Sequence, residues 1–257
     1  MIRYILVLLF TLVLSPVWGQ DSYQNLVKAY KSNSIPLLEE FLNTWNKKSI
    51  PITNLGGLSE IEKNTYAIYQ DFFNPFAIDK YGKHEWGNNL YAEIKYVIIQ
   101  NNIQSIVLKT DSIEQDFRNY PDSLIVQNII ISDFKPNLRF DSAEVLFLTS
   151  EYTSCLNKFL KKKHYKLGTG GIMNPARATG NAILKQDFLN QRLLVLHGHW
   201  GGYWYLETHP QIRNITFNRD LTKAKINFRI AYQGGEAYYI KKDDKWIMVS
   251  SDITWIE

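Results

Sequence analysis

The sequence contains almost no cysteine, and this limits how the fold can be held together. Cys155 is the only cysteine among 257 residues, so no disulfide can form within the chain. Exported eukaryotic domains of this size usually carry disulfides, so the sequence favours a bacterial envelope protein. Cys155 lies in an amphipathic segment, where we expect a small buried hydrophobic residue rather than a nucleophile.

The chain also has little net charge. It has 29 basic and 25 acidic residues, a formal net charge of +4. Nucleic-acid binding requires a concentrated basic face. The only basic run, Lys161–Lys163 followed by Lys166, is typical of a solvated last helical turn, where cations interact favourably with the helix dipole. We therefore expect no nucleic-acid partner.

Catalytic and cofactor motifs are missing as well. The sequence has no G-x-S-x-G, no H-E-x-x-H, no C-x-x-C and no phosphate-binding loop. The glycine-rich stretch Gly168–Gly171 follows a predicted helix instead of a strand, which argues against phosphate binding. We assign no catalytic residue, no cofactor and no metal from motifs.

The one long hydrophobic run lies at the N-terminus and has the pattern of a signal peptide. Arg3 precedes an apolar stretch from Tyr4 to Leu14, and small residues follow at Val17 and Gly19. The apolar run is about eleven residues, whereas a membrane-spanning helix needs about twenty. We expect residues 1–19 to be cleaved, which leaves an exported, periplasmic or extracellular protein with no integral membrane segment.

Helix signals are clearest in the first half of the remaining chain. Ser34 precedes Pro36 and an apolar stripe that ends at Trp45, which predicts a helix with Ser34 as its N-cap. Ser59 and Glu62 have the spacing of a capping box, which predicts a second helix over 59–73. A third helix is predicted to begin at residue 150.

The middle of the chain has the alternating pattern of strands. Apolar residues alternate with Glu93 and Lys95 over 92–98, which predicts a half-buried strand. Asn101 and Asn102 favour a tight turn, so residues 103–109 are expected to return as its hairpin partner. Two more strands are predicted over 125–134 and 144–149.

The C-terminal part is predicted to be almost entirely β. Residues 223–233 alternate so regularly that one face should be core and the other solvent. Turns are expected at Gly201-Gly202, Gly234-Gly235 and Asp243-Asp244, and such short connections imply antiparallel neighbours. The predicted strands are Leu193–Trp200, Tyr203–His209, Ile212–Asn218, Lys223–Gln233, Glu236–Lys241 and Lys245–Trp255.

Together these patterns predict an α+β fold. A curved antiparallel β-meander at the C-terminus packs with helices, and an N-terminal region supplies helices and a hairpin. We divide the chain into a signal peptide over 1–19, an α+β region over 20–175 and a β-meander region over 176–257. The two folded regions either have separate cores or share one.

Four segments of the C-terminal region resemble a known superfamily. They are Ile215–Asn218, Leu221–Phe228, Gly234–Tyr239 and Lys245–Val249. They resemble the closing strands of the nuclear-transport-factor-2-like, ketosteroid-isomerase-like superfamily over residues 192–257. The resemblance implies helices wrapped around a curved sheet, which form a cone with a pocket.

Catalytic members of that superfamily place a carboxylate inside an apolar pocket. Here Glu236, Asp243 and Asp244 fall at predicted turns, where solvent is the natural partner. The resemblance therefore carries over no catalytic residue.

Two histidines on one predicted strand are the best candidates for a site. His197 and His199 are separated by one residue, so their side chains point to the same face of a strand. A hairpin turn at Gly201-Gly202 places Trp204 on that face, opposite His199. We assign His197, His199 and Trp204 as ligand-binding residues. The alternatives are ordinary sheet histidines, or a metal site completed by His84 or His164.

These observations lead to three hypotheses about function. The first is an exported, non-catalytic binding or accessory protein that holds a small molecule, a glycan or a protein partner in a cleft between sheet and helices. The second is an envelope hydrolase or isomerase that uses His197 or His199 as a base. The third is a structural or protein-neutralising role.

Overall fold

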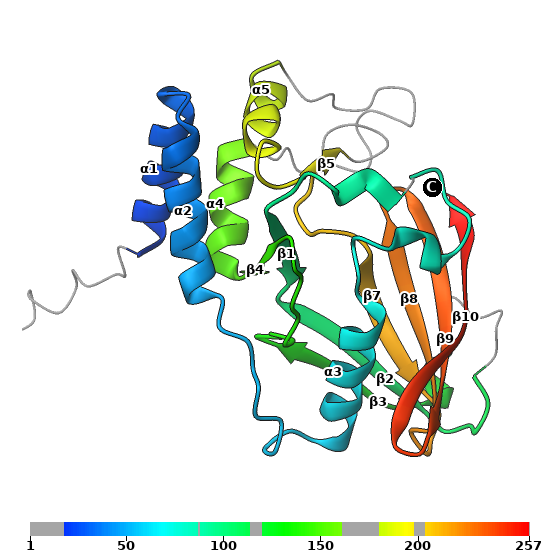
Figure 1. Cartoon of the computed structure of the whole chain (residues 1–257). Helices are drawn as coiled ribbons and strands as arrows, with labels where there is room; N and C mark the ends of the chain where they lie inside the picture. Colours follow the sequence, from blue (N-terminus) through cyan, green and yellow to red (C-terminus); the bar gives the residue numbers. More distant parts are fainter. Residues whose placement is uncertain (1–17, 87, 114–119, 161–179, 198–203, 257) are drawn as a thin grey trace, which may run out of the picture.

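The computed structural model of the chain describes residues 18–86, 88–113, 120–160, 180–197 and 204–256 (Figure 1). The α+β prediction is confirmed, because helices pack against a six-stranded, mostly antiparallel sheet. The strand order is β10-β9-β8-β7-β2-β3, and only β2 and β7 are parallel neighbours. The strands are β2 (Asn102–Leu108), β3 (Ile125–Ser132), β7 (Gln211–Phe217), β8 (Lys223–Ile230), β9 (Gln233–Lys242) and β10 (Lys245–Ile256).

The predicted meander from β7 to β10 is confirmed, and local turns explain most of it. Asn218 follows β7 directly, and its side-chain oxygen accepts hydrogen bonds from the backbone N–H groups of Thr222 and Lys223. Asp243 and Asp244 both adopt positive φ angles, 48° and 58°, in the turn between β9 and β10. Aspartate tolerates this conformation better than most residues, so the turn predicted there is formed.

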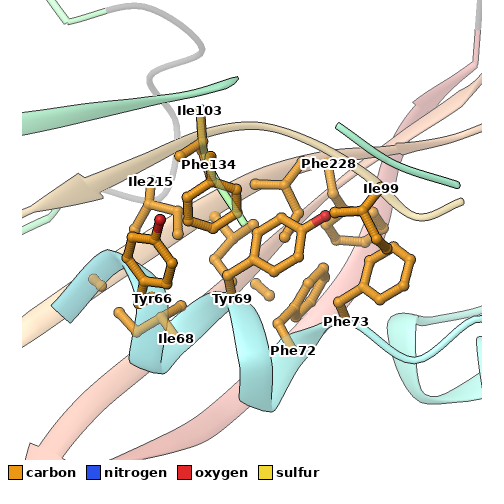
Figure 2. Packing of buried hydrophobic residues seen from close by; sticks show 14 of the residues in the cluster. Tyr66, Ile68, Tyr69, Phe72, Phe73, Ile99, Ile103, Phe134, Ile215 and Phe228 are labelled. Atoms are coloured by element: carbon orange, nitrogen blue, oxygen red, sulfur yellow. The ribbon is translucent and has the colours of Figure 1, made fainter. Parts of the chain in front are cut away.

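One face of the sheet is covered by helix α3 (Glu60–Phe72). The predicted capping box is present, since Ser59 and Glu62 bond to each other's backbone N–H groups. Tyr69 and Phe72 on α3 point towards the sheet residues Ile215 and Phe228, as Figure 2 shows. We call this buried set the first hydrophobic cluster. It fills the space between α3 and the sheet.

A second hydrophobic cluster lies among four helices on the other side of the molecule (Figure 1). Trp45 is fully buried there; its ring stacks on Tyr152 with centroids 4.2 Å apart, and its Nε1 donates to the Phe147 carbonyl oxygen. The helices are α1 (Trp18–Lys31), α2 (Ile35–Lys48), α4 (Ser150–Leu160) and α5 (Gly180–Leu189). Helix α1 was not predicted from the sequence, although Tyr23, Leu26, Val27 and Tyr30 have the spacing of one helical face.

The hairpin predicted for the middle of the chain is wrong. Strand β1 (Tyr96–Gln100) does not pair with β2; it pairs in parallel with β4 (Glu144–Leu148). It is also not half-buried, because Tyr96 and Ile98 contact the second cluster while Val97 and Ile99 contact the first. Because neither face of β1 meets water, β1 and β4 form a two-stranded ribbon between the two clusters.

Two other strand predictions need correction. The turn after β8 is formed by residues 231–232, where Ala231 has a φ of 51°, and not by Gly234-Gly235. Both glycines lie inside β9. The long strands expected over 193–200 and 203–209 reduce, within the described residues, to β5 (Leu196–His197) and β6 (Trp204–Tyr205).

The sheet combines both parts of the chain. Strands β2 and β3 come from residues 20–175, and β7 to β10 come from 176–257. The first hydrophobic cluster likewise includes Ile103 from β2 and Ile226 from β8. Both regions therefore contribute to the same sheet and the same buried cluster.

The sequence predicts cleavage of an N-terminal signal peptide, export and no integral membrane segment. No helix within the described residues is long and apolar enough to cross a bilayer. Residues 1–17 lie outside the described part of the chain, and so do Lys161–Lys163, Lys166 and Gly168–Gly171. Cleavage and export stay predictions.

Cys155 is expected to be chemically inert in the folded protein. Its side chain lies in the second cluster, the residue is 3% exposed, and burial raises the pKa of the thiol to about 12. The thiolate is the reactive form, so modification by a thiol reagent at pH 8 should be on the order of 10³-fold slower than in urea. Absorbance of the released chromophore measures both rates, and Cys155→Ser provides the blank. Native and unfolded rates within tenfold of each other would contradict this.

Candidate functional site

The face of the sheet that points away from α3 carries a row of polar side chains. Gln104 on β2 is the register partner of Asn214 on β7, which is in turn the partner of Asn227 on β8. Asn227 is the partner of Glu236 on β9. These four side chains, which we call the polar row, therefore cross the sheet at right angles to its strands.

The polar row forms the floor of a cavity of about 430 Å³, which we call the sheet-face pocket. Small-molecule sites in proteins usually have volumes of about 300–1,000 Å³. The pocket is thus large enough for a small ligand. Its lining residues are Gln104, Arg213, Asn214, Asn227, Phe228, Gly235, Glu236 and Trp255.

A bulge in β7 explains how an arginine reaches this face of the sheet. The register of β7 with β8 shifts between Ile212 and Asn214, so Arg213 is left out of the ladder. A bulge changes the direction in which the extra side chain points. The Arg213 guanidinium carbon lies 4.9 Å from the centre of the Trp255 ring, and that of Arg229 lies 5.6 Å from it.

Trp255 lies over a glycine of the neighbouring strand. Gly234 is the register partner of Trp255, and a Cβ atom at position 234 would overlap the indole ring. A glycine inside a strand often marks such a close approach. This accounts for a glycine that the sequence analysis assigned to a turn.

One member of the polar row, Glu236, forms a buried ion pair. Lys225 is fully buried, and its Nζ lies 3.4 Å from Oε1 of Glu236. The Tyr238 hydroxyl donates to Oε2 of the same carboxylate at 2.7 Å, and the Lys225 ammonium lies 5.0 Å from the centre of the Tyr120 ring. The desolvation cost of burying two charges is offset by these partners.

The ion pair corrects two expectations. Lys225 lies on the face of β8 that was predicted to meet solvent, yet it is 0% exposed. Glu236 was placed at a turn, yet it lies within β9 and is 8% exposed. The alternation along β8 did identify the two faces correctly, but it could not indicate what covers the polar one.

Hydrogen bonds within the polar row leave part of its capacity unused. Nδ2 of Asn227 donates to Oδ1 of Asn214 at 2.8 Å, and Nε2 of Gln104 donates to Oδ1 of Asn128 at 2.8 Å. Among the described residues, neither the Asn214 amide nitrogen nor the Asn227 amide oxygen has a partner. The pocket floor therefore offers both a donor and an acceptor to a ligand.

A buried histidine, His209, lies near Arg229, whose guanidinium is close to the Trp255 ring. The Tyr91 hydroxyl accepts from the His209 backbone N–H at 3.0 Å and lies 2.9 Å from Nδ1 of the same residue. Nε2 has no partner within the described residues. Burial, together with the Arg229 charge, lowers the pKa of His209 to about 3. The centre of the Tyr205 ring lies 5.2 Å from the centre of the His209 ring and 5.3 Å from the guanidinium carbon of Arg229.

Three residues were predicted from the sequence to bind a ligand. Two of them, His197 and Trp204, do not line the sheet-face pocket, and the third lies outside the described residues. His197 in β5 is the register partner of Trp204 in β6, so the predicted pairing of Trp204 with His199 is wrong. Trp204 is 5% exposed, belongs to the second hydrophobic cluster and does not line the sheet-face pocket. His199 lies outside the described residues. A ligand-binding role for the three stays a prediction.

The described residues provide no set of ligands for the metal site considered as an alternative in the sequence analysis. Within them, no group of three histidine, cysteine, aspartate or glutamate side chains could hold an ion. His84 lies 3.4 Å from Asp79, and Nδ1 of His84 accepts a hydrogen bond from the Trp86 backbone. His164 lies outside the described part.

A second cavity, of about 410 Å³, lies between the end of α2 and β4. Two of its polar side chains already bond to the protein. Asn46 donates to the Val145 carbonyl oxygen, and the Ser49 hydroxyl accepts from the Phe147 backbone and donates to the Trp45 carbonyl oxygen. Its lining also includes Arg139 and Glu144.

Comparisons of the chain with protein-family models, with curated proteins and with solved structures find no match.

Proposed function

We propose that this is an exported, non-catalytic binding protein that holds a small polar molecule in the sheet-face pocket. The observation that carries the proposal is the polar row beneath a cavity of about 430 Å³. Amide groups with unused hydrogen-bonding capacity bind a polar ligand at little cost, because they need no rearrangement. The signal-peptide pattern of residues 1–19 supports export.

The bonds of Glu236 favour binding over acid–base catalysis. A catalytic carboxylate must have an oxygen within hydrogen-bond reach of the proton that it exchanges with the substrate. Both oxygens of Glu236 are engaged, one by the Lys225 ammonium and one by the Tyr238 hydroxyl. Both oxygens of the Glu236 side chain are thus held in contacts within the protein, which favours a fixed structural role over proton exchange with a substrate.

The proposed pocket does not lie where the sequence analysis expects a cleft, which is between the sheet and the helices. The space between the sheet and α3 is filled by aromatic side chains, including Tyr69, Phe72 and Phe134 (Figure 2). The sheet-face pocket lies on the opposite side of the same sheet. The resemblance to the nuclear-transport-factor-2-like superfamily implies a pocket against its curved sheet, and it stays a prediction.

Gly234→Ala is expected to weaken ligand binding at least tenfold, because the new methyl group displaces Trp255 from the pocket wall. The ligand is first found by a thermal-shift screen of sugars, amino acids, nucleosides and organic acids. A ligand at 100 times its Kd adds about 2.7 kcal/mol of stability. For a chain of this size, that corresponds to a rise in Tm of about 5–10 °C.

The matched control is Gly57→Ala, because no atom lies within 4 Å of the added methyl group. This variant should bind like the unmodified protein. The proposal is wrong if no compound raises Tm, or if Gly234→Ala binds the ligand with unchanged Kd.

A further inference from the structure

We infer that the second cavity, of about 410 Å³ between the end of α2 and β4, binds a free α-amino acid with an apolar side chain. This site is separate from the sheet-face pocket, because the two cavities share no lining residue. Two features of the second cavity carry the inference. It has two opposite charges that do not pair with each other, and an apolar wall beside them.

The positive charge of the second cavity comes from Arg139. This residue lines the cavity from the loop between β3 and β4, and it is exposed. Within the described residues, the Arg139 guanidinium has neither an ion-pair partner nor a hydrogen-bond partner. A guanidinium can donate two parallel hydrogen bonds to one carboxylate. Arg139 is therefore available to hold the carboxylate of a ligand.

The negative charge comes from Glu144, the first residue of β4. Its backbone N–H donates to the Lys95 carbonyl oxygen at 2.9 Å, and its Oε2 accepts from Nδ2 of Asn46 at 3.4 Å. Neither Arg139 nor another cation of the described part of the chain forms an ion pair with this carboxylate. An ammonium group carries three donors and no acceptor, so it suits a carboxylate that still has unused oxygen lone pairs.

The two charges together favour a zwitterion over a ligand with one charge. An anion held by Arg139 is repelled by Glu144, and a cation held by Glu144 is repelled by Arg139. An α-amino acid carries a carboxylate and an ammonium group on adjacent atoms. It therefore meets an opposite charge at each of its ends.

The apolar wall selects the side chain of the amino acid. The wall is formed by Pro51, Pro136, Leu138, Phe140, Ala143, Val145 and Phe147. Phe140 is fixed by other rings, since its centre lies 5.4 Å from that of Phe76 and 6.3 Å from that of Phe73. An apolar side chain that covers this wall removes surface from water on both partners, which favours binding.

A polar side chain gains less in the same place. The nearby Asn46 amide donates to the Val145 carbonyl oxygen, and the Ser49 hydroxyl both accepts and donates within the protein. A ligand hydroxyl or amide would lose its bonds to water and compete for groups that are already bonded. The cavity thus favours leucine, methionine or phenylalanine over serine or aspartate.

Calorimetric titration of the full chain tests the ligand class. Leucine, methionine and phenylalanine are each titrated up to about 10 mM, a range that includes weak binding. At least one of them should bind. For leucine, the comparison compounds are 4-methylpentanoate, which lacks the amino group, and 3-methylbutylamine, which lacks the carboxylate. Each such analogue, and serine and aspartate, should bind at least fivefold more weakly than the amino acid.

Two charge variants test the site. Arg139→Gln should weaken binding of the amino acid at least fivefold without weakening that of the amine, because the amine has no carboxylate. Glu144→Gln should weaken binding of the amino acid at least fivefold without weakening that of the carboxylic acid. Arg219→Gln and Glu60→Gln are the matched controls, since both residues are exposed and line neither cavity. Circular dichroism checks that all four variants are folded.

Three results would overturn the inference: no amino acid of the set binds, an analogue with one charge binds as tightly as the amino acid, or the folded variants at Arg139 and Glu144 keep full affinity. Binding that is weakened by Gly234→Ala and not by Arg139→Gln would also overturn it, because the amino acid would then occupy the sheet-face pocket. In that case the proposed function stands while the second site fails.

Discussion

Lys225→Met is expected to lower the free energy of unfolding by about 3–5 kcal/mol. The substitution leaves the Glu236 carboxylate buried without its ammonium partner, which lies 3.4 Å away in the native protein. Methionine has a similar length, so the loss reports the missing charge more than a missing volume. Urea unfolding followed by circular dichroism measures the change.

The double variant Lys225→Met/Glu236→Gln separates charge from packing. Once the carboxylate is replaced by an amide, no uncompensated charge remains, and most of the lost stability should return. Lys63→Met is the matched control, since Lys63 pairs with Glu60 at an exposed position and should change stability little. A double variant that is as unstable as the sum of the two single variants would refute the role given to this pair.

Acidification is expected to destabilise the protein through His209. The folded pKa is about 3, below the unfolded value of about 6.5, so below pH 6.5 the unfolded state binds a proton that the native state excludes. Stability is therefore fully present above pH 6.5 and is lost as pH falls towards 3. The loss is about 1.4 kcal/mol per pH unit.

Comparison with His209→Asn isolates this contribution. An asparagine oxygen can replace Nδ1 as the acceptor for Tyr91, but it does not titrate. Between pH 7.5 and 4.5, the unmodified protein should lose about 2–3 kcal/mol more than the variant. Urea unfolding at both pH values provides the numbers. Carboxylates titrate in both proteins and cancel in the difference, so parallel pH profiles would show that His209 is not responsible.

Helices and the C-terminal meander could be predicted because their signals are local. Ser34 caps α2 through the backbone N–H of Leu37, three residues away. Ser59 and Glu62 cap α3 in the same way. The turn at Asp243 and Asp244 also depends only on adjacent residues. Interactions over such short separations can be recognised from sequence patterns alone.

The pairing of β1 could not be predicted, because its partner lies far along the chain. The alternation that suggested a half-buried strand comes partly from Glu93 and Lys95, which precede the strand itself. From Tyr96 to Gln100 every residue is buried. Such a strand gives no alternating pattern, and nothing local shows that Ile98 pairs with Leu146.

The candidate site depended even more on distant contacts. Gly234 and Gly235 have the pattern of a turn, and only the position of Trp255 explains the first of them. The burial of Lys225 depends on residues such as Glu236 and Tyr120, which reach it from other parts of the chain. The sequence did contain one signal for this site, a glycine pair together with a tryptophan near the end of the last strand.

The ribbon of β1 and β4 joins the helical layer and the sheet into one cooperative unit (Figure 1). Ile98 and Leu146 face the helices, whereas Ile99 and Phe147 face the sheet. The same backbone hydrogen bonds thus support both apolar surfaces. If the helical layer unfolded, one face of the ribbon would be exposed to water. The ribbon would then be destabilised, and the sheet would lose packing contacts with it. We therefore expect the helical layer and the sheet to unfold together.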